Sequence, residues 1–228
     1  MGQYNAALLS IVSTPIGNLG DITFRAHETL QKCHGIICED TRVTGKLLSL
    51  LRLPKKELVS FHSYSDPAKA KWIVDRLKSG AHFCLVCDAG TPCISDPGYL
   101  IVALAKQAGS KMEVLPGPSA FLAALSASGL PMNQFVYLGF LPIKKGRQTL
   151  LKSFREEERT IVFYESPHRI LKSLHELKEL LAAQTNRRIV ICRELTKLHE
   201  DVTRTTLGEL QPNAVKAKGE FVIVLEGR

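Results

Sequence analysis

The sequence predicts an α/β protein built of two α/β domains, the first around a five-stranded parallel sheet and the second around a mixed sheet. Short apolar segments of strand length alternate along the chain with segments whose apolar residues recur at helical spacing. The motif Pro116-Gly117-Pro118 interrupts this alternation near the middle of the 228 residues. A hydrophobic content of 45% with 23% charged residues excludes a disordered chain. We therefore expect domains at residues 1–116 and 117–228.

Five apolar segments in the first half predict the strands of the parallel sheet. They span residues 8–13, 35–38, 57–61, 82–87 and 112–115. Asp21 is expected to cap the first helix, whose apolar face carries Phe24, Ala26 and Leu30. The other helices are expected after Asp40-Thr41, from Asp66-Pro67 to Gly80, and over residues 98–108. Strands joined by helices of these lengths pair in parallel through right-handed crossovers.

The second half continues the alternation and then changes it. Helices are expected at residues 119–127, 146–157 and 168–182, and strands at 135–140, 160–164, 188–194, 202–207 and 220–225. No long helix separates the last two strands, which predicts a mixed sheet or an antiparallel edge.

The net charge and the length of the apolar runs limit the kinds of partner that the chain can bind. The chain has 30 Lys and Arg against 22 Asp and Glu, a net charge of +8, which is compatible with an anionic partner such as RNA but is shared by many enzymes. The longest apolar run, residues 100–105, is much shorter than a membrane span, and the first seven residues do not have the pattern of a targeting signal. We expect a cytoplasmic protein that does not bind membranes.

The cysteine pattern does not predict a metal centre. Cys84 and Cys87 have the spacing of a metal-binding pair, but they lie in a segment that reads as a buried strand, where residues three apart point to opposite faces. A zinc site would also need a second pair of ligands at suitable spacing. We expect buried structural thiols and no bound metal.

Three loops of the first half are candidates for a binding site, because ligands of open α/β sheets bind beyond the carboxyl ends of the strands. They are residues 13–23, Glu39-Asp40-Thr41-Arg42 and the segment from Asp88 to Gly98. The first is also compatible with a tight turn and the second with a helix cap and surface ion pairs. The third has two Gly, two Pro and two Asp after a strand, which favours recognition of a small polar ligand by backbone groups.

In the second half, the segment from Phe163 to Arg169 again joins a strand to a helix. Its acid, histidine and arginine could bind substrate, and Ser166 with Pro167 also fits an N-cap followed by Pro at the first helical position. The basic cluster Lys144-Lys145-Gly146-Arg147 is interpreted as a solvated loop more readily than as a nucleic-acid contact.

These loops resemble the rRNA methyltransferases of the tetrapyrrole methylase superfamily. The resemblance covers essentially the whole chain, and the run from Asp88 to Gly98 is its most specific part. The family usually has Ser at the position of Cys87 and usually continues beyond residues 220–227 into a helical tail. The motifs are Thr14-Pro15-Ile16-Gly17-Asn18-Leu19, Asp21-Ile22-Thr23, Glu39-Asp40-Thr41-Arg42, Asp88-Ala89-Gly90-Thr91-Pro92, Ile94-Ser95-Asp96-Pro97-Gly98, Pro116-Gly117-Pro118-Ser119-Ala120 and Tyr164-Glu165-Ser166-Pro167-His168-Arg169.

The resemblance implies a homodimer that methylates the ribose 2′-oxygen of a cytidine in 16S rRNA of the small ribosomal subunit and not DNA. It also implies S-adenosylmethionine as cofactor, in a cleft between the two domains. The implied cofactor contacts are Pro15, Asp88, Gly90, Thr91, Ile94, Ser95, Asp96, Ser119, Ala120, Phe163 and Tyr164.

Methyl transfer to a hydroxyl needs in-line placement of the reactants and help with the hydroxyl proton. Asp40, Glu39 and Glu165 are the candidate bases, and the sequence does not rank them. Arg42 and Arg169 are the candidate phosphate contacts. Two other functions stay open: a methylase of the same superfamily that acts on a small tetrapyrrole or corrin precursor, and an rRNA-binding assembly protein without catalytic activity.

Overall fold

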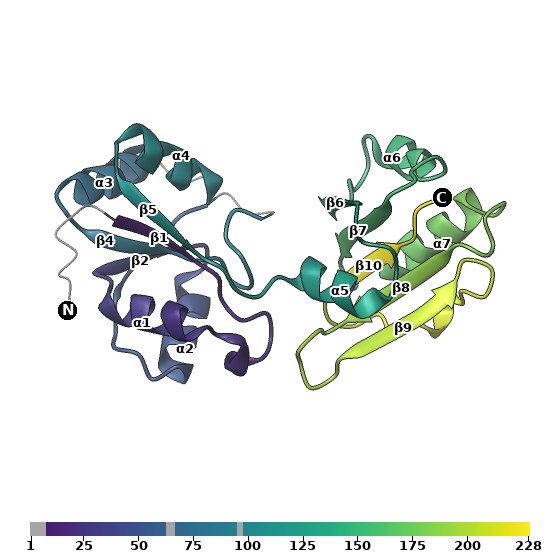
Figure 1. The fold of residues 1–228 in the computed structure, drawn as a ribbon, viewed down its shortest axis with the longest axis horizontal. Coiled ribbons are helices and arrows are strands. Elements are labelled where there is room, and N and C mark those ends of the chain that lie inside the picture. The colour runs from purple at the N-terminus through teal and green to yellow at the C-terminus, as the bar shows by residue number, and fades with distance from the viewer. Residues whose placement is uncertain (1–7, 63–66, 95–97) are drawn as a thin grey trace. The chain divides into compact units, whose positions relative to one another are not determined.

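The computed structural model describes residues 8–62, 67–94 and 98–228 (Figure 1). The chain divides into two compact units, Met1–Ser119 and Ala120–Arg228, each with its own sheet. The first is a five-stranded parallel sheet and the second a five-stranded mixed sheet, so the predicted fold class is confirmed. No helix within the described ranges is long and apolar enough to span a membrane.

The first unit holds its strands in the order β3-β2-β4-β1-β5. They are β1 (Leu8–Val12), β2 (Gly35–Cys38), β3 (Glu57–Ser60), β4 (His82–Leu85) and β5 (Lys111–Leu115). Each pair of neighbours is parallel. β2 and β4 are buried along their whole length, as expected of strands covered on both faces.

Four helices cover the two faces of this sheet. α1 (Phe24–Lys32) and α2 (Thr41–Leu50) pack on one face, where Ala26, Leu30 and Leu48 meet Val12 and Leu115. α3 (Pro67–Lys78) and α4 (Tyr99–Gln107) pack on the other, where their side chains meet residues of β1 and β4 (Figure 1).

This topology creates a switch point between β4 and β1. The chain leaves β1 over the face of α1 to reach β2, and it leaves the neighbouring β4 over the face of α4 to reach β5. Two adjacent strands whose connections depart to opposite faces open a crevice at their carboxyl ends, where ligands of such sheets bind. The loops after β1 and β4 meet at this point.

The start of the first helix differs from the prediction. Asp21 lies in a short 3₁₀ helix, η1 (Leu19–Asp21), and α1 is capped by Thr23, whose hydroxyl accepts a hydrogen bond from the Ala26 N–H at 3.1 Å. Both Asp and Thr are good caps, and the 3₁₀ turn moves the helix start. Phe24 was expected on the apolar face, but its side chain is 94% exposed. Asp66, the cap expected for α3, lies outside the described residues.

The second unit holds its strands in the order β6-β7-β10-β8-β9. β6 and β7 are parallel, and the other neighbours are antiparallel. The strands are β6 (Phe135–Phe140), β7 (Thr160–Glu165), β8 (Arg188–Arg193), β9 (Asp201–Thr206) and β10 (Phe221–Leu225).

Helices cover both faces of the second sheet as well. α5 (Ala120–Ser128) packs on one face, and α6 (Arg147–Ser153), α7 (Ile170–Leu180) and the 3₁₀ helix η2 (Pro212–Ala214) lie on the other (Figure 1). α6 is shorter than predicted. α7 begins at Ile170, with Arg169 in the cap position and no side-chain cap bond, so the predicted cap at Ser166 is wrong. Ser166 contributes its carbonyl instead, which accepts from the N–H groups of Arg169 and Ile170.

Candidate active site

Backbone hydrogen bonds join the loops after β1 and β4 at the switch point. The Thr14 N–H donates to the Gly90 carbonyl at 2.8 Å, and the Gly90 N–H donates back to Thr14 at 3.1 Å, which forms an isolated antiparallel bridge. Gly90 has a φ of +88°, a conformation that favours glycine. The two segments singled out in the sequence therefore form one structure.

Side chains tie the loop after β5 to the same place. The Thr91 hydroxyl donates to the Pro118 carbonyl at 3.0 Å and lies 3.1 Å from the Ser13 hydroxyl, which donates to the Leu115 carbonyl at 3.2 Å. A Cβ at Gly117 would come within 2.8 Å of the Ser13 Cβ, so the close approach requires glycine. The carboxyl ends of β1, β4 and β5 thus form one preorganised edge.

The other implied cofactor residues of the first unit lie on these loops. Pro15 and Ser119 are half-buried, Asp88 is exposed, and the Ile94 side chain is 39% exposed. The implied residues Ser95 and Asp96 lie outside the described residues.

The acidic loop after β2 reaches the same edge. Asp40 caps α2 by accepting from the Arg42 N–H at 2.8 Å, and its backbone N–H donates to the Asp88 carboxylate at 3.2 Å. The Arg42 side chain, which is exposed, forms a bidentate ion pair with Asp40. Hydrogen bonding to Arg42 lowers the pKa of Asp40 to about 2. Glu39, at the end of β2, is half-buried.

In the second unit, the side chains of Phe163 and Tyr164 lie on opposite faces of the sheet. Phe163 is fully buried in the core beneath α6 and α7, with its ring 6.3 Å from that of Phe154, so its side chain cannot contact a ligand. Tyr164 points to the opposite face and is half-buried, with ring neighbours Tyr137 and Phe140, each at 5.5 Å. Only the main chain of Phe163 can take the role that the resemblance implies. Ala120 is half-buried on the face of Tyr164.

Glu165 is the centre of a buried ionic cluster at the carboxyl end of β7. One carboxylate oxygen accepts from the Ser166 N–H at 2.8 Å and forms an ion pair with Arg169 at 2.9 Å. The other accepts from the Ser173 hydroxyl at 2.5 Å and lies 3.9 Å from Arg147. The Glu165 side chain has no exposed surface. These contacts leave it poorly placed to receive a proton from a substrate and suit it to holding Arg169.

Arg147 is the residue of this cluster that the sequence interpretation missed. Its side chain is only 5% exposed and donates to Glu176 at 2.6 and 2.9 Å, to Ser173 at 2.8 Å and to the Pro142 carbonyl at 3.1 Å. The interpretation of the basic cluster as a solvated loop is therefore wrong for Arg147, although Lys144 and Lys145 are exposed. The two acids that bind Arg147 follow it by many residues, so local spacing does not reveal them.

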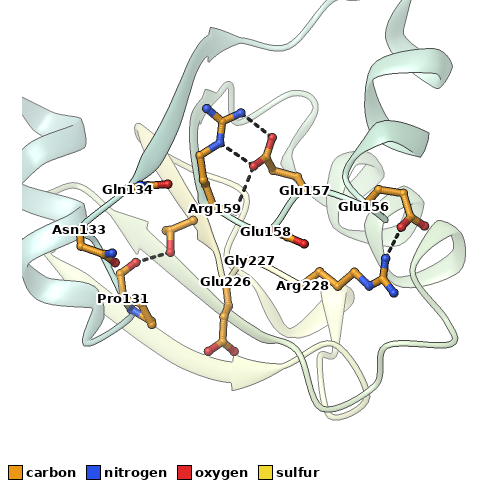
Figure 2. Close-up of a pocket in the computed structure, with 11 residues that line it drawn as sticks. Pro131, Asn133, Gln134, Glu156, Glu157, Glu158, Arg159, Glu226, Gly227 and Arg228 are labelled. Carbon is orange, nitrogen blue, oxygen red and sulfur yellow. Dashed lines mark hydrogen bonds and ion pairs between the residues drawn. The ribbon is translucent and has the colours of Figure 1, made fainter.

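A hollow of about 650 Å³ lies at the other end of the second sheet, beside the start of β7 and the end of β10 (Figure 2). Most of its charged side chains form ion pairs: Arg159 donates to Glu157 at 2.7 and 2.9 Å, Arg228 is paired with Glu156, and Glu226 is paired with Arg188. The implied site residues do not line it, so it is not the candidate site. No group of three or more metal-binding side chains occurs among the described residues.

Comparison with known proteins identifies the family. Residues 8–211 match the family model described as Tetrapyrrole (Corrin/Porphyrin) Methylases. The chain belongs to the tetrapyrrole methylase family, whose members transfer methyl groups from S-adenosylmethionine.

Within the family, eight sequence relatives share one name. The chain is 46% identical to Ribosomal RNA small subunit methyltransferase I of Vibrio cholerae over 97% of its length and 78% of the relative. It is 44% identical to the protein of the same name from Thermotoga maritima over 96% of its length and 98% of the relative.

Solved structures support the fold. A cobalt precorrin-4 methyltransferase superposes with a TM-score of 0.70 over 99% of this chain and 97% of that one, at 17% identity. Uroporphyrin-III C-methyltransferase from Thermus thermophilus, solved with S-adenosylhomocysteine, gives a TM-score of 0.65 at 18% identity over 96% of each chain.

Proposed function

We propose that this chain is an S-adenosylmethionine-dependent methyltransferase that acts on the ribose 2′-oxygen of a cytidine in 16S rRNA. The observation that carries the proposal is the joined loops of β1 and β4 at the switch point, in a chain 43–46% identical to eight proteins named Ribosomal RNA small subunit methyltransferase I. An rRNA substrate implies work in the cytoplasm on the small ribosomal subunit, and a ribose 2′-hydroxyl excludes DNA.

The switch-point edge suits the cofactor. Bound there, S-adenosylmethionine supplies a methyl group on a sulfonium. The loop residues Pro15, Asp88, Gly90, Thr91, Ile94, Ser95, Asp96 and Ser119 would bind it from the first unit, and Ala120, Tyr164 and the main chain of Phe163 from the second. Tyr164 offers a half-buried aromatic ring, and the bridge between Thr14 and Gly90 fixes the backbone of these two residues before the cofactor binds.

Of the three candidate acids, we infer that Glu39 is the general base. A base works best when its pKa is near the working pH, and Arg42 holds the pKa of Asp40 at about 2. Asp40 keeps its negative charge and orients Arg42, which can contact a substrate phosphate. Glu165 orients Arg169 for the same purpose from the second unit.

The direct test uses purified protein, labelled S-adenosylmethionine and small ribosomal subunits that lack this methylation. Digestion of the 16S rRNA to nucleosides and mass spectrometry should find one 2′-O-methylcytidine. A DNA oligonucleotide of matched sequence is the control and should receive no label.

Two results would replace the proposal. Transfer to a small tetrapyrrole but not to small subunits would support the small-molecule methylase, a function compatible with the fold of the solved relatives. Binding to small subunits without transfer to any acceptor would support an rRNA-binding protein without catalytic activity.

A further inference from the structure

Two arginines hold the loop between β6 and α6, the buried Arg147 and the partly exposed Arg169. Arg169 donates to the Leu141 carbonyl at 3.0 Å, and Arg147 donates to the Pro142 carbonyl at 3.1 Å. Both guanidinium groups are also held by carboxylates, Arg169 by Glu165 and Arg147 by Glu176. Two consecutive carbonyls of the loop are therefore fixed from the protein interior.

A tight turn completes the loop. The Arg147 N–H donates to the Lys144 carbonyl at 3.3 Å, and Gly146 has φ +81° and ψ −11°. These angles are those of the third residue of a type II turn, a position that favours glycine. The turn presents Lys144 and Lys145 to solvent from a backbone that is already ordered.

Exposed apolar side chains lie beside these lysines. Phe140, the last residue of β6, is 56% exposed although its ring is 5.5 Å from Tyr164, and Ile143 is 71% exposed. The parallel register pairs Phe140 with Tyr164, so both lie at the carboxyl edge of β6 and β7, where Arg169 also lies. Exposed aromatic and basic groups on an ordered frame are the combination that binds unpaired RNA, by base stacking and phosphate contacts.

We propose that Phe140 and the loop Leu141–Arg147 form an RNA-contact element that binds an unpaired segment of the substrate. Phe140 stacks on a base, Lys144 and Lys145 contact phosphates, and Arg147 acts as the positioning residue that holds the loop. This inference rests on the proposed function and assigns part of the substrate-binding surface to residues outside the family motifs that point to the cofactor.

The lysine test compares two double variants with the same loss of charge. The control, Lys106→Ala with Lys111→Ala, removes exposed lysines from the last turn of α4 and the start of β5, at the amino-terminal edge of the first sheet. Affinity for protein-free 16S rRNA is measured against salt concentration, and affinity for S-adenosylmethionine by calorimetry.

Lys144→Ala with Lys145→Ala should raise the dissociation constant for RNA and reduce the slope of log affinity against log salt by about 1.4, since each phosphate contact to a single strand contributes about 0.7. The control should keep the wild-type slope, and both should bind the cofactor normally. An unchanged slope in the loop variant overturns the proposal. A loss seen with small subunits but absent with protein-free rRNA also overturns it, because the loop would then contact a ribosomal protein.

The aromatic test separates stacking from simple loss of surface. Phe140→Ala should raise KM for small subunits by between about 5-fold and 150-fold, and Phe140→Trp should restore it, because stacking tolerates any aromatic ring. The Kd for the cofactor should stay constant in both. An equal KM in Phe140→Ala and wild type overturns the role of Phe140. If the wild-type protein transfers no methyl group to RNA, both the proposed function and this inference are wrong. If the wild-type protein transfers the methyl group and the loop variants bind RNA and turn over as it does, only this inference is wrong.

Discussion

At the scale of single residues, the ion pair of Arg42 and Asp40 gives a titration prediction. Arg42→Ala should raise the pKa of Asp40 from about 2 towards its ordinary value of 3.8, because the lost hydrogen bonds favoured the charged form. Carbon-detected NMR titration of the Asp40 carboxyl would measure this directly. A pKa that stays near 2 in the variant would show that another group holds the charge.

The same substitution separates substrate binding from cofactor binding. Arg42→Ala should weaken RNA binding or turnover and leave calorimetric affinity for S-adenosylmethionine unchanged. Glu39→Gln should lower kcat more than Asp40→Asn, because the ion pair with Arg42 makes Asp40 a poor proton acceptor. A larger loss of kcat in Asp40→Asn would assign the base to Asp40 instead.

The backbone conformation of Gly90 allows a test of where the cofactor binds. Its φ of +88° makes Gly90→Val a strained substitution that costs about 1–2 kcal/mol of unfolding free energy and disturbs the bridge to Thr14. Calorimetry should show loss of cofactor binding, and circular dichroism should show a folded protein. Gly80→Val is a matched control, since Gly80 has φ +91° and ends α3 away from the loops. Unchanged cofactor affinity in Gly90→Val would reject this placement of the site.

At this scale, the sequence predicted site residues correctly where the residue types that suit ligand binding also determine the local backbone conformation. The density of Gly, Pro and Asp between Asp88 and Gly98 identified the loop that the structure joins to Thr14. The assignment of both Phe163 and Tyr164 to one ligand overlooked that neighbouring strand residues point to opposite faces. The role of Arg147 could not be predicted, because Glu176 lies on another helix, 29 residues further along.

At the scale of elements, three strands share a buried polar network. The Ser10 hydroxyl of β1 donates to Glu113 of β5 at 2.6 Å and lies 2.7 Å from the His82 ring of β4. Burial lowers the pKa of His82 below its usual 6.5, opposed by Glu113 and assisted by the nearby charges of His34 and Lys56.

A pH dependence of stability follows from this network. Because the folded protein favours neutral His82, the contribution of His82 is complete above pH 6.5 and is lost as the pH falls through its lowered folded-state pKa. Urea unfolding of the first unit should therefore need less denaturant at pH 5.5 than at pH 7.5. His82→Asn should reduce this difference, and His168→Asn, at an exposed position of the second unit, should not. An equal difference in His82→Asn would contradict the assignment.

The cluster around Glu165 connects β7, α6 and α7. Arg147→Met should destabilise the second unit by about 3–5 kcal/mol, because it leaves Glu165 and Glu176 with less compensation in a buried setting. Chemical denaturation measures the loss. The double variant Arg147→Met with Glu176→Met should recover much of it, and a double variant as unstable as the single one would show that packing rather than charge is responsible.

The order of elements was predicted well and their ends less so. Apolar segments predicted the inner strands of both sheets, because a strand that is covered on both faces is apolar along its length. β9, at the edge of the second sheet, is largely polar and exposed. The starts of α1 and α7 were misplaced, since Asp21 and Ser166 have the chemistry of caps while the chain makes an extra turn at each place.

At the scale of the whole molecule, the resemblance predicts a homodimer. Light scattering of the purified chain at micromolar concentration should give about twice the monomer mass of 25.2 kDa. A mass equal to one chain would reject the prediction. RNA affinity should also fall steeply with salt while cofactor affinity changes little, because only RNA binding releases counterions from a phosphate backbone.

Because of the position of β10, the two sheets can be completed at different points of translation. The first sheet is complete once β5 has left the ribosome, because all its strands precede residue 116. The second sheet has β10 at its centre, between β7 and β8, so the pairs β6–β7 and β8–β9 stay apart until residues 221–225 have been made. Through most of the synthesis of this unit, two unpaired inner edges are exposed to solvent, and unpaired edges can pair wrongly with other chains. The nascent second unit is therefore the stage at which this protein most needs chaperone protection.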